Sequence, residues 1–236
     1  MVVSRSFLFA PLIALILALL LPLVLEVRES GFGWKFRFLY LLLVLSLNIY
    51  PLLLAGWASN RKYALVGGLR GVSQTISYEI SLAFLLMALF LELGELALAS
   101  AAGPSLLWAF PVLGLWGVSC IAELNRTPFD FSEGESELVS GFNIEYGAVK
   151  FATIFIAEYA IIFTLSLFTR LILLPSQTFT LQVVILGVLL ASAVIWLRAT
   201  YPRFRYDLLI NLAWKVLLPW SLGLVQLTAG VVILSI

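Results

Sequence analysis

Long apolar runs alternate with short polar connections along the chain. A helix needs about 20 apolar residues to cross a bilayer, and seven runs of about that length lie near residues 7–25, 37–56, 71–93, 105–122, 148–170, 179–198 and 208–235. Alternating segments of about ten residues, which are typical of a membrane barrel, are not visible. The pattern predicts an all-α integral membrane protein, a bundle of about seven transmembrane helices that forms a single membrane domain over residues 1–236.

Composition excludes the soluble class. Hydrophobic residues make up 62% of the chain and charged residues 11%, and the mean hydropathy is +1.09. A soluble domain is about 45–50% apolar and about 25% charged. The first apolar run is too long for a signal peptide and lacks a small-residue cleavage site, so we expect no targeting peptide. With no histidine and one cysteine, Cys120, the chain is not expected to bind a metal or haem or to form an internal disulfide.

The basic residues predict which connections share a side of the membrane. With seven spans, ten Lys and Arg residues fall on one side and four on the other. The richer side includes the connections near 57–70, 123–147 and 199–207. Because basic residues favour the inner side, we expect this side to face the cytoplasm or the mitochondrial matrix. The acidic connection at 123–147 and the basic connection at 199–207 should then share one face.

The connection at 123–147 holds nearly half of the chain's acidic residues. Six of the 13 lie there: Glu123, Asp130, Glu133, Glu135, Glu137 and Glu145. Ionising one carboxylate disfavours ionisation of the next, so such a cluster can hold and release protons. A solvated loop is the alternative, but apolar residues such as Phe129, Phe131 and Phe142 are interleaved with the acids. This interleaving favours packing against a partner or a cavity wall.

Two acids lie inside predicted spans. Glu79 is about eight residues into its span, roughly 12 Å deep at about 1.5 Å per residue, and Glu158 is near the middle of another. A charged acid at mid-membrane costs about 2.5–3.5 kcal/mol, so both should face the bundle interior or a wet cavity. A structural acid that hydrogen-bonds to a neighbouring helix remains the alternative. Glu123 and Arg126 are three apart and could pair on one helix face.

The basic connection reads RATYPRFRYD and carries Arg198, Arg203 and Arg205. Orientation in the membrane alone would explain the arginines. The interleaved aromatic residues Tyr201, Phe204 and Tyr206 favour either an acidic partner or a polar ligand headgroup that arrives from the membrane. Both remain open.

Four segments together resemble the quinone-tunnel membrane subunit of respiratory complex I, the NADH-ubiquinone oxidoreductase chain 1 family. They are GWASNRKYALVGGLRGVSQTISYEI (56–80), AELNRTPFDFSEGESELVSGFNIEY (122–146), AEYA (157–160) and RATYPRFRYD (198–207). The resemblance implies a core membrane subunit that forms part of the quinone tunnel and of a carboxylate path coupling quinone reduction to proton translocation. It implies ubiquinone as substrate, no redox centre in this chain, and FMN and iron–sulfur clusters in partner subunits.

The resemblance also implies roles for individual residues. Glu79, Glu123, Glu145 and Glu158 match the family's buried carboxylates, Glu133, Glu135 and Glu137 match its acidic matrix loop, and Asp130 matches the start of that loop. Arg126 and Arg198 match arginines near the tunnel and the proton path. We add Arg203, Arg205 and Phe142 as expected tunnel residues or charge partners. No residue is expected to be a metal ligand or to carry the redox chemistry itself.

The chain departs from the family at its beginning. Family members normally have eight spans, and residues 1–11 align just before the second. We expect that a separate chain or other subunits supply the first helix, or that it is lost. The expected partners are quinone-site and iron–sulfur peripheral-arm subunits, small membrane subunits, ubiquinone and lipids, with no nucleic acid. The expected location is the mitochondrial inner membrane, ahead of a bacterial plasma membrane.

Three other functions remain open from the sequence. The nearest is the related membrane anchor of a proton-pumping membrane-bound hydrogenase, which has similar helices and no quinone. A transporter would place the acids in a substrate path, but no inverted repeat supports it. A purely structural anchor would tolerate every carboxyl-to-amide change.

Overall fold

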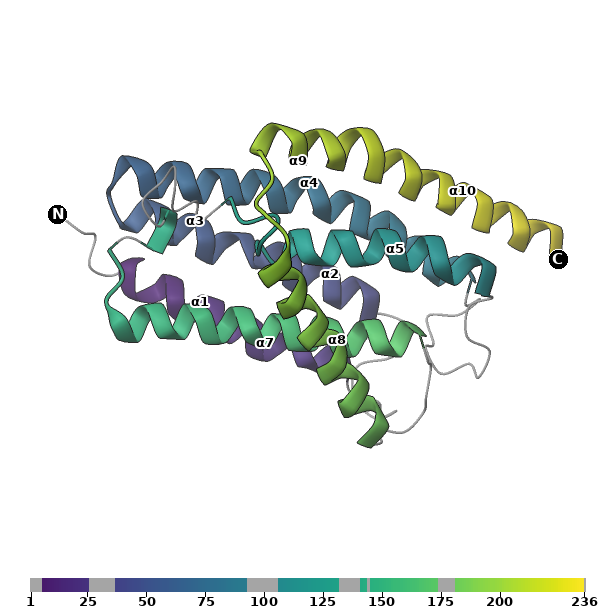
Figure 1. The fold of residues 1–236 in the computed structure, drawn as a ribbon, viewed down its shortest axis with the longest axis horizontal. Helices are drawn as coiled ribbons and strands as arrows, with labels where there is room; N and C mark the ends of the chain where they lie inside the picture. Colours follow the sequence, from purple (N-terminus) through teal and green to yellow (C-terminus); the bar gives the residue numbers. More distant parts are fainter. Residues whose placement is uncertain are drawn as a thin grey trace.

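The protein is an all-α bundle, as predicted (Figure 1). The computed structural model describes residues 6–25, 37–92, 106–131, 141–143, 145–173 and 181–235, and no strand occurs in these ranges. The helices are α1 (Ser6–Leu20), α2 (Arg37–Leu47), α3 (Ile49–Ala58), α4 (Lys62–Glu92), α5 (Leu106–Glu123), α7 (Ala148–Leu173), α8 (Leu181–Thr200), α9 (Tyr206–Leu212) and α10 (Leu218–Ser235). Short 3-10 turns η1 (Leu21–Leu25) and η3 (Gly141–Asn143) and a π-helical turn η4 (Ala213–Leu217) complete the described elements.

In the part of the chain that the structure describes, five helical segments are long and apolar enough to cross a membrane. They are Phe7–Leu25, Phe38–Ala58, Lys62–Leu89, Ala148–Arg170 and Tyr206–Val231. Within the described residues, the segments Pro111–Glu123 and Val184–Thr200 are apolar but shorter. Pro111–Glu123 corresponds to the fourth predicted run, near 105–122, and Val184–Thr200 corresponds to the sixth, near 179–198.

The second long segment is interrupted at Asn48, between α2 and α3. The Asn48 amide still donates to the carbonyls of Val44 (3.2 Å) and Leu45 (3.0 Å), so the chain continues in the same direction. Pro51 follows in the first turn of α3, where its missing N–H is best tolerated. The break leaves the Asn48 side chain on the inner face of an otherwise apolar rod.

Helix α4 lies at the centre of the bundle and packs against α3, α5 and α10, while α7 packs against α1 and α8 (Figure 1). The core is built from large buried side chains such as Trp116, Tyr78 and Phe168. The Trp116 indole nitrogen donates to Thr169 Oγ1 (2.9 Å), which joins α5 to α7. Helix α5 thus lies between α4, against which it packs, and α7.

Two glycines bring the backbones of α3 and α4 into contact. A Cβ added at Gly56 would lie 2.8 Å from the carbonyl oxygen of Ala64, and one added at Gly68 would lie 3.3 Å from that of Leu52. Ordinary side chains would overlap with the facing helix at this separation. The α3–α4 hairpin is therefore tight, in keeping with the close packing that glycines permit between membrane helices.

Polar contacts join the C-terminal segment to α4. The hydroxyls of Tyr206 and Ser73 are 2.6 Å apart, the Trp214 indole donates to Ser77 Oγ (3.2 Å), and the Tyr78 hydroxyl donates to the Leu209 carbonyl (3.2 Å). The indole contact comes from the π-helical turn η4, and the two tyrosine contacts involve residues of α9. These hydrogen bonds fix the rotation of α9 and η4 against α4.

Candidate functional site

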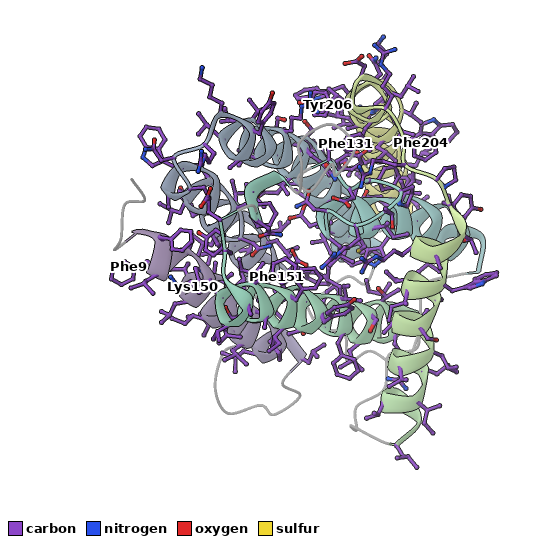
Figure 2. All side chains as sticks on the ribbon, turned by 60° about the vertical axis from the view of Figure 1, so that its left-hand side comes forward. Phe9, Phe131, Lys150, Phe151, Phe204 and Tyr206 are labelled. Carbon is purple, nitrogen blue, oxygen red and sulfur yellow. The ribbon has the colours of Figure 1, made fainter. Side chains whose placement is uncertain are left out.

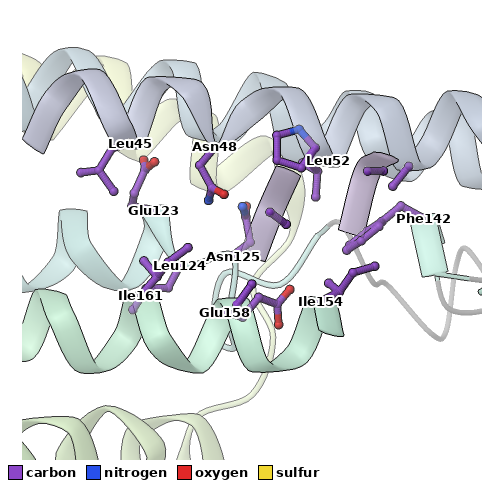
Figure 3. Close-up of a pocket in the computed structure, with 15 residues that line it drawn as sticks. Leu45, Asn48, Leu52, Glu123, Leu124, Asn125, Phe142, Ile154, Glu158 and Ile161 are labelled. Carbon is purple, nitrogen blue, oxygen red and sulfur yellow. The ribbon is translucent and has the colours of Figure 1, made fainter. Parts of the chain in front are cut away.

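A pocket lies between α1, the α2–α3 rod, α7 and the end of α5 (Figure 3). Most of its wall is apolar. Four polar side chains interrupt it, namely those of Asn48, Glu123, Asn125 and Glu158. The apolar lining residues are Ala10, Ala14, Leu45, Pro51, Leu52, Ala55, Leu124, Phe142, Ile154, Ala157 and Ile161. A small set of polar groups in an apolar cavity is the usual composition of a site for an organic ligand.

Glu123 reaches the pocket because α5 ends there. The side chain is buried, with the residue 3% exposed, and its Oε2 has no hydrogen-bond partner among the described residues. Glu79 of α4, which is half-buried, interacts electrostatically with it. Burying a carboxylate oxygen without a hydrogen-bond donor costs free energy. A bound proton, a water or a donor group of a ligand would reduce that cost.

The turn after α5 depends on Asn125. Its φ of 49° is left-handed, and its amide donates to the Ala122 carbonyl (3.2 Å). Asparagine is one of the few residues that adopts this conformation readily. The buried Asn125 Oδ1 lacks a partner in the described part of the chain. The same residue therefore ends the helix and places an amide group at the pocket.

Gln74 of α4 holds this turn in place from behind. Its Nε2 donates to the carbonyls of Ala122 and Phe129, both at 2.8 Å, and the residue is fully buried. One side-chain amide thereby holds two backbone acceptors, on either side of Asn125. The Ala122 carbonyl also accepts the Asn125 amide, so the Phe129 carbonyl depends more strongly on Gln74.

Glu158 of α7 forms an ion pair with Arg126 across the pocket wall. Arg126 is 2% exposed, and its guanidinium lies over the rings of Phe155 (4.8 Å) and Tyr159 (5.7 Å). The Tyr159 hydroxyl in turn accepts a hydrogen bond from Arg198 Nη1 (3.1 Å). The expectation that Glu123 and Arg126 pair on one helix face is wrong, because α5 ends at Glu123 and Arg126 lies beyond it.

The acidic and basic connections contact each other, as predicted for segments on one face. Arg203 Nη2 lies 3.2 Å from Asp130 Oδ2, and the Phe204 amide donates to the Pro128 carbonyl (3.1 Å). The rings of Phe129 and Phe204 stack with centroids 5.8 Å apart. Figure 2 shows Phe131, Phe204 and Tyr206 close together at this corner, and the rings of Phe131 and Tyr206 meet edge to face at 5.8 Å.

Phe7, Phe142 and Tyr146 form a hydrophobic cluster near the start of α7, and Phe142 lines the pocket. Phe142 is buried, and the rings of Phe7 and Tyr146 stack with centroids 4.2 Å apart. Lys150 Nζ lies 4.2 Å from the centroid of the Phe7 ring, and Figure 2 shows Lys150 at the beginning of α7. Burial raises the pKa of Tyr146 to about 12, so its hydroxyl stays neutral.

The remaining predicted residues lie away from the pocket or outside the described ranges. Arg61 Nε pairs with Glu145 Oε1 (2.8 Å) near the surface, and Arg205 pairs with Asp207 (3.1 Å) on an exposed part of the chain. Glu133, Glu135 and Glu137 lie outside the described residues. No group of three or more His, Cys, Asp or Glu side chains suited to a metal occurs in the part of the chain that the structure describes.

Three site residues were not anticipated from the sequence. Asn48 and Asn125 line the pocket, and Gln74 supports it. Asn48 is a lone amide in an apolar run just before a proline, which is a usable signal. Gln74 gave a weaker signal because it stands in a polar half-span with several hydroxyl residues. Asn125 looked like an ordinary loop residue.

Comparison with known proteins identifies the family. A family model described as NADH dehydrogenase matches residues 2–229. The chain is 45% identical to NADH-ubiquinone oxidoreductase chain 1 of Branchiostoma lanceolatum over 94% of its own length and 72% of that protein. It is 43% identical to the protein of that name from Balaenoptera physalus and 42% identical to the one from Aedes aegypti, in each case over 94% of this chain and 73% of the relative. The chain belongs to the NADH dehydrogenase family, alongside the chain 1 subunits of NADH-ubiquinone oxidoreductase.

Proposed function

We propose that the pocket between α1, α2–α3 and α7 is part of the ubiquinone-binding tunnel, and that its carboxylates couple quinone reduction to proton translocation. Family membership makes the chain a membrane subunit of an NADH-ubiquinone oxidoreductase. The observation that carries the finer proposal is the meeting of Glu123 and Glu158 in one largely apolar pocket.

The lining suits a quinone. Apolar side chains such as Leu45, Leu52 and Ile161 match an isoprenoid tail or ring face, and the Asn48 amide can donate to a quinone carbonyl. Reduction to the quinol needs two electrons and two protons. In this proposal the electrons come from iron–sulfur clusters fed by FMN in partner subunits, and this chain supplies the cavity and the charged groups.

In this proposal the carboxylates relay the change in charge that accompanies quinone reduction. Glu123 borders the pocket and interacts electrostatically with Glu79 on α4. A change in protonation or charge at Glu123 alters the free energy of ionising Glu79, because like charges disfavour each other. Glu158, fixed by Arg126, holds a second charge at the pocket wall. The outer carboxylates Asp130, Glu133, Glu135, Glu137 and Glu145 belong to the same proposed path on the matrix side.

The three relatives named above come from animals. The proposed location is the mitochondrial inner membrane, with the connection at 123–147 facing the matrix. The proposed partners are the quinone-site and iron–sulfur subunits of the peripheral arm and the adjacent small membrane subunits. Arg198, Arg203 and Arg205 are proposed as charge partners at the junction with the peripheral arm.

Amide substitutions test the proposal. Glu123→Gln and Glu158→Gln in the assembled enzyme should each lower NADH:ubiquinone reductase activity or the protons moved per turnover by at least about tenfold, because a positioned acid–base group contributes about a hundredfold or more. Asp207→Asn, which removes an exposed carboxylate paired with Arg205, is the matched control. NADH oxidation by a hydrophilic acceptor should stay unchanged in all three variants.

Two results would overturn the proposal. Normal quinone reduction and pumping in both glutamine variants would mean that neither carboxylate takes part. Copurification of the chain with a nickel–iron subunit, and without flavin and iron–sulfur NADH dehydrogenase subunits, would favour the hydrogenase anchor instead.

A further inference from the structure

A lysine faces outward from the last membrane-crossing segment. Lys215 lies in η4 within the segment Tyr206–Val231, and its side chain is exposed. No ion pair or hydrogen bond of Lys215 occurs among the described residues. Nine residues beyond Tyr206, its backbone is about 14 Å along the helix, which is deeper than the headgroup layer of about 5–8 Å on each side of a bilayer. An ammonium group at this depth requires an anionic partner or a route to the interface.

The lysine stands at one end of an apolar groove. The groove is lined by Lys215, Pro219, Trp220, Gly223, Leu224 and Leu227. Residues 215, 219, 223 and 227 follow one another at intervals of four, so they run down a single face of the helix. Gly223 leaves the groove open, because a Cβ built there meets no atom within 4 Å. Figure 1 shows that α10 lies along the outer edge of the bundle, against α4.

The geometry points to a binding site for an anionic phospholipid of the surrounding bilayer, with its phosphate on Lys215 and an acyl chain along Pro219, Gly223 and Leu227. Helix side chains tilt toward the helix N-terminus, so the ammonium group of Lys215 is directed toward the side of the connection at 199–207. Phosphates lie at that interface. The groove extends the opposite way, toward the membrane interior, which is where an acyl chain extends.

Neighbouring side chains give the groove a polar end near Lys215 and an apolar end towards Leu227. Asn211 is exposed one helical turn before Lys215 and offers an amide donor beside the ammonium group. Trp220 is 62% exposed and Leu227 58% exposed along the groove, which supplies apolar contact but no charge. A zwitterionic lipid would fill the groove equally well, so the net negative charge of the headgroup is what Lys215 selects.

Photo-crosslinking tests this site, which is independent of the quinone chemistry. The assembled enzyme is reconstituted in vesicles containing traces of acyl-chain diazirine phosphatidylglycerol or diazirine phosphatidylcholine, and labelled peptides are mapped by mass spectrometry. Peptides covering 215–227 should be labelled about fivefold more by phosphatidylglycerol, the ratio expected for one basic residue near the interface. Lys215→Gln should abolish the preference. Lys62→Gln, at the exposed start of α4, should leave it intact.

A second variant separates the groove from the charge. Gly223→Leu fills the groove and keeps the lysine, so it should reduce labelling of these peptides by both lipids while native gels show normal assembly. Equal labelling by the two lipids in the unmodified enzyme would overturn the proposal. So would the absence of label together with a carbodiimide crosslink from Lys215 to another subunit, since that result would assign the anionic partner to a protein carboxylate.

Discussion

Arg126 and Glu158 form an ion pair that links the connection after α5 to the middle of α7. Arg126 is almost fully buried, whereas the Glu158 side chain is 23% exposed and borders the pocket. Two aromatic rings of α7, those of Phe155 and Tyr159, flank the guanidinium. The pair therefore fixes the wall of the pocket and sets the local charge at the same time.

Removing one member of this pair should cost more than removing both. Glu158→Leu leaves the buried Arg126 without this carboxylate, and breaking a buried pair costs about 3 kcal/mol or more. The double variant Arg126→Leu/Glu158→Leu should recover much of that loss, because the buried guanidinium is removed together with the Glu158 carboxylate. Thermal inactivation of the assembled enzyme, followed by NADH oxidation with a hydrophilic acceptor, measures stability without using the quinone site. Equal losses in the single and double variants would contradict this account.

Gln74 should contribute to stability through its two donated hydrogen bonds. Gln74→Leu keeps the volume but removes this donor from the carbonyls of Ala122 and Phe129. Ala122 keeps its bond from the Asn125 amide, so the cost of about 1–3 kcal/mol for an unpaired buried group applies chiefly to Phe129. Gln226→Leu changes an exposed glutamine of α10 and should be nearly neutral. Native gels after stepwise heating would show whether the first variant loses assembly at lower temperature. Indistinguishable behaviour of the two variants would count against the role of Gln74.

Asn125 combines a backbone role with a side-chain role, and two substitutions separate them. Asn125→Ala should destabilise by about 1–2 kcal/mol, because a Cβ without a local hydrogen-bonding group disfavours the left-handed φ of 49°. Asn125→Gly retains the turn, so assembly should be normal. The Asn125 amide lines the proposed quinone pocket, so the glycine variant should show a raised KM for ubiquinone with unchanged assembly. An unchanged KM would remove Asn125 from the quinone site.

Tyr146 should tolerate loss of its hydroxyl. The hydroxyl is buried without a hydrogen-bond partner among the described residues, and Tyr146→Phe keeps the ring stacked on Phe7. The variant should therefore be as stable as the natural chain or slightly more stable at neutral pH. Because burial raises the pKa of Tyr146 to about 12, the hydroxyl ionises more readily in the unfolded state, so the free energy of unfolding falls as the pH rises from 10 to 12. Between pH 10 and 12, the free energy of unfolding should therefore fall less steeply with pH in Tyr146→Phe than in the natural chain.

The apolar periodicity was sufficient to predict the fold class, and the resemblance was sufficient to predict the family. Neither the apolar pattern nor the resemblance predicts that Glu123 and Glu158 line one pocket, because that arrangement depends on where α5 ends and on the left-handed turn at Asn125. The pairing of Arg126 shows the same limit. The three-residue spacing suggests that Arg126 pairs with Glu123, but α5 ends before Arg126. Its partner is instead Glu158 of α7, 32 residues further along the chain. Local rules predict segments well, whereas partners from distant helices depend on packing that no single segment encodes.

The glycine contact between α3 and α4 has a mechanical consequence. Helix α3 lines the pocket through Leu52 and Ala55, and α4 carries both Glu79 and Gln74. At Gly56 and Gly68 the two backbones touch with no side chain between them that could rearrange and absorb a shift. We therefore expect α4, which carries Glu79, to move together with α3 when a molecule in the pocket displaces α3.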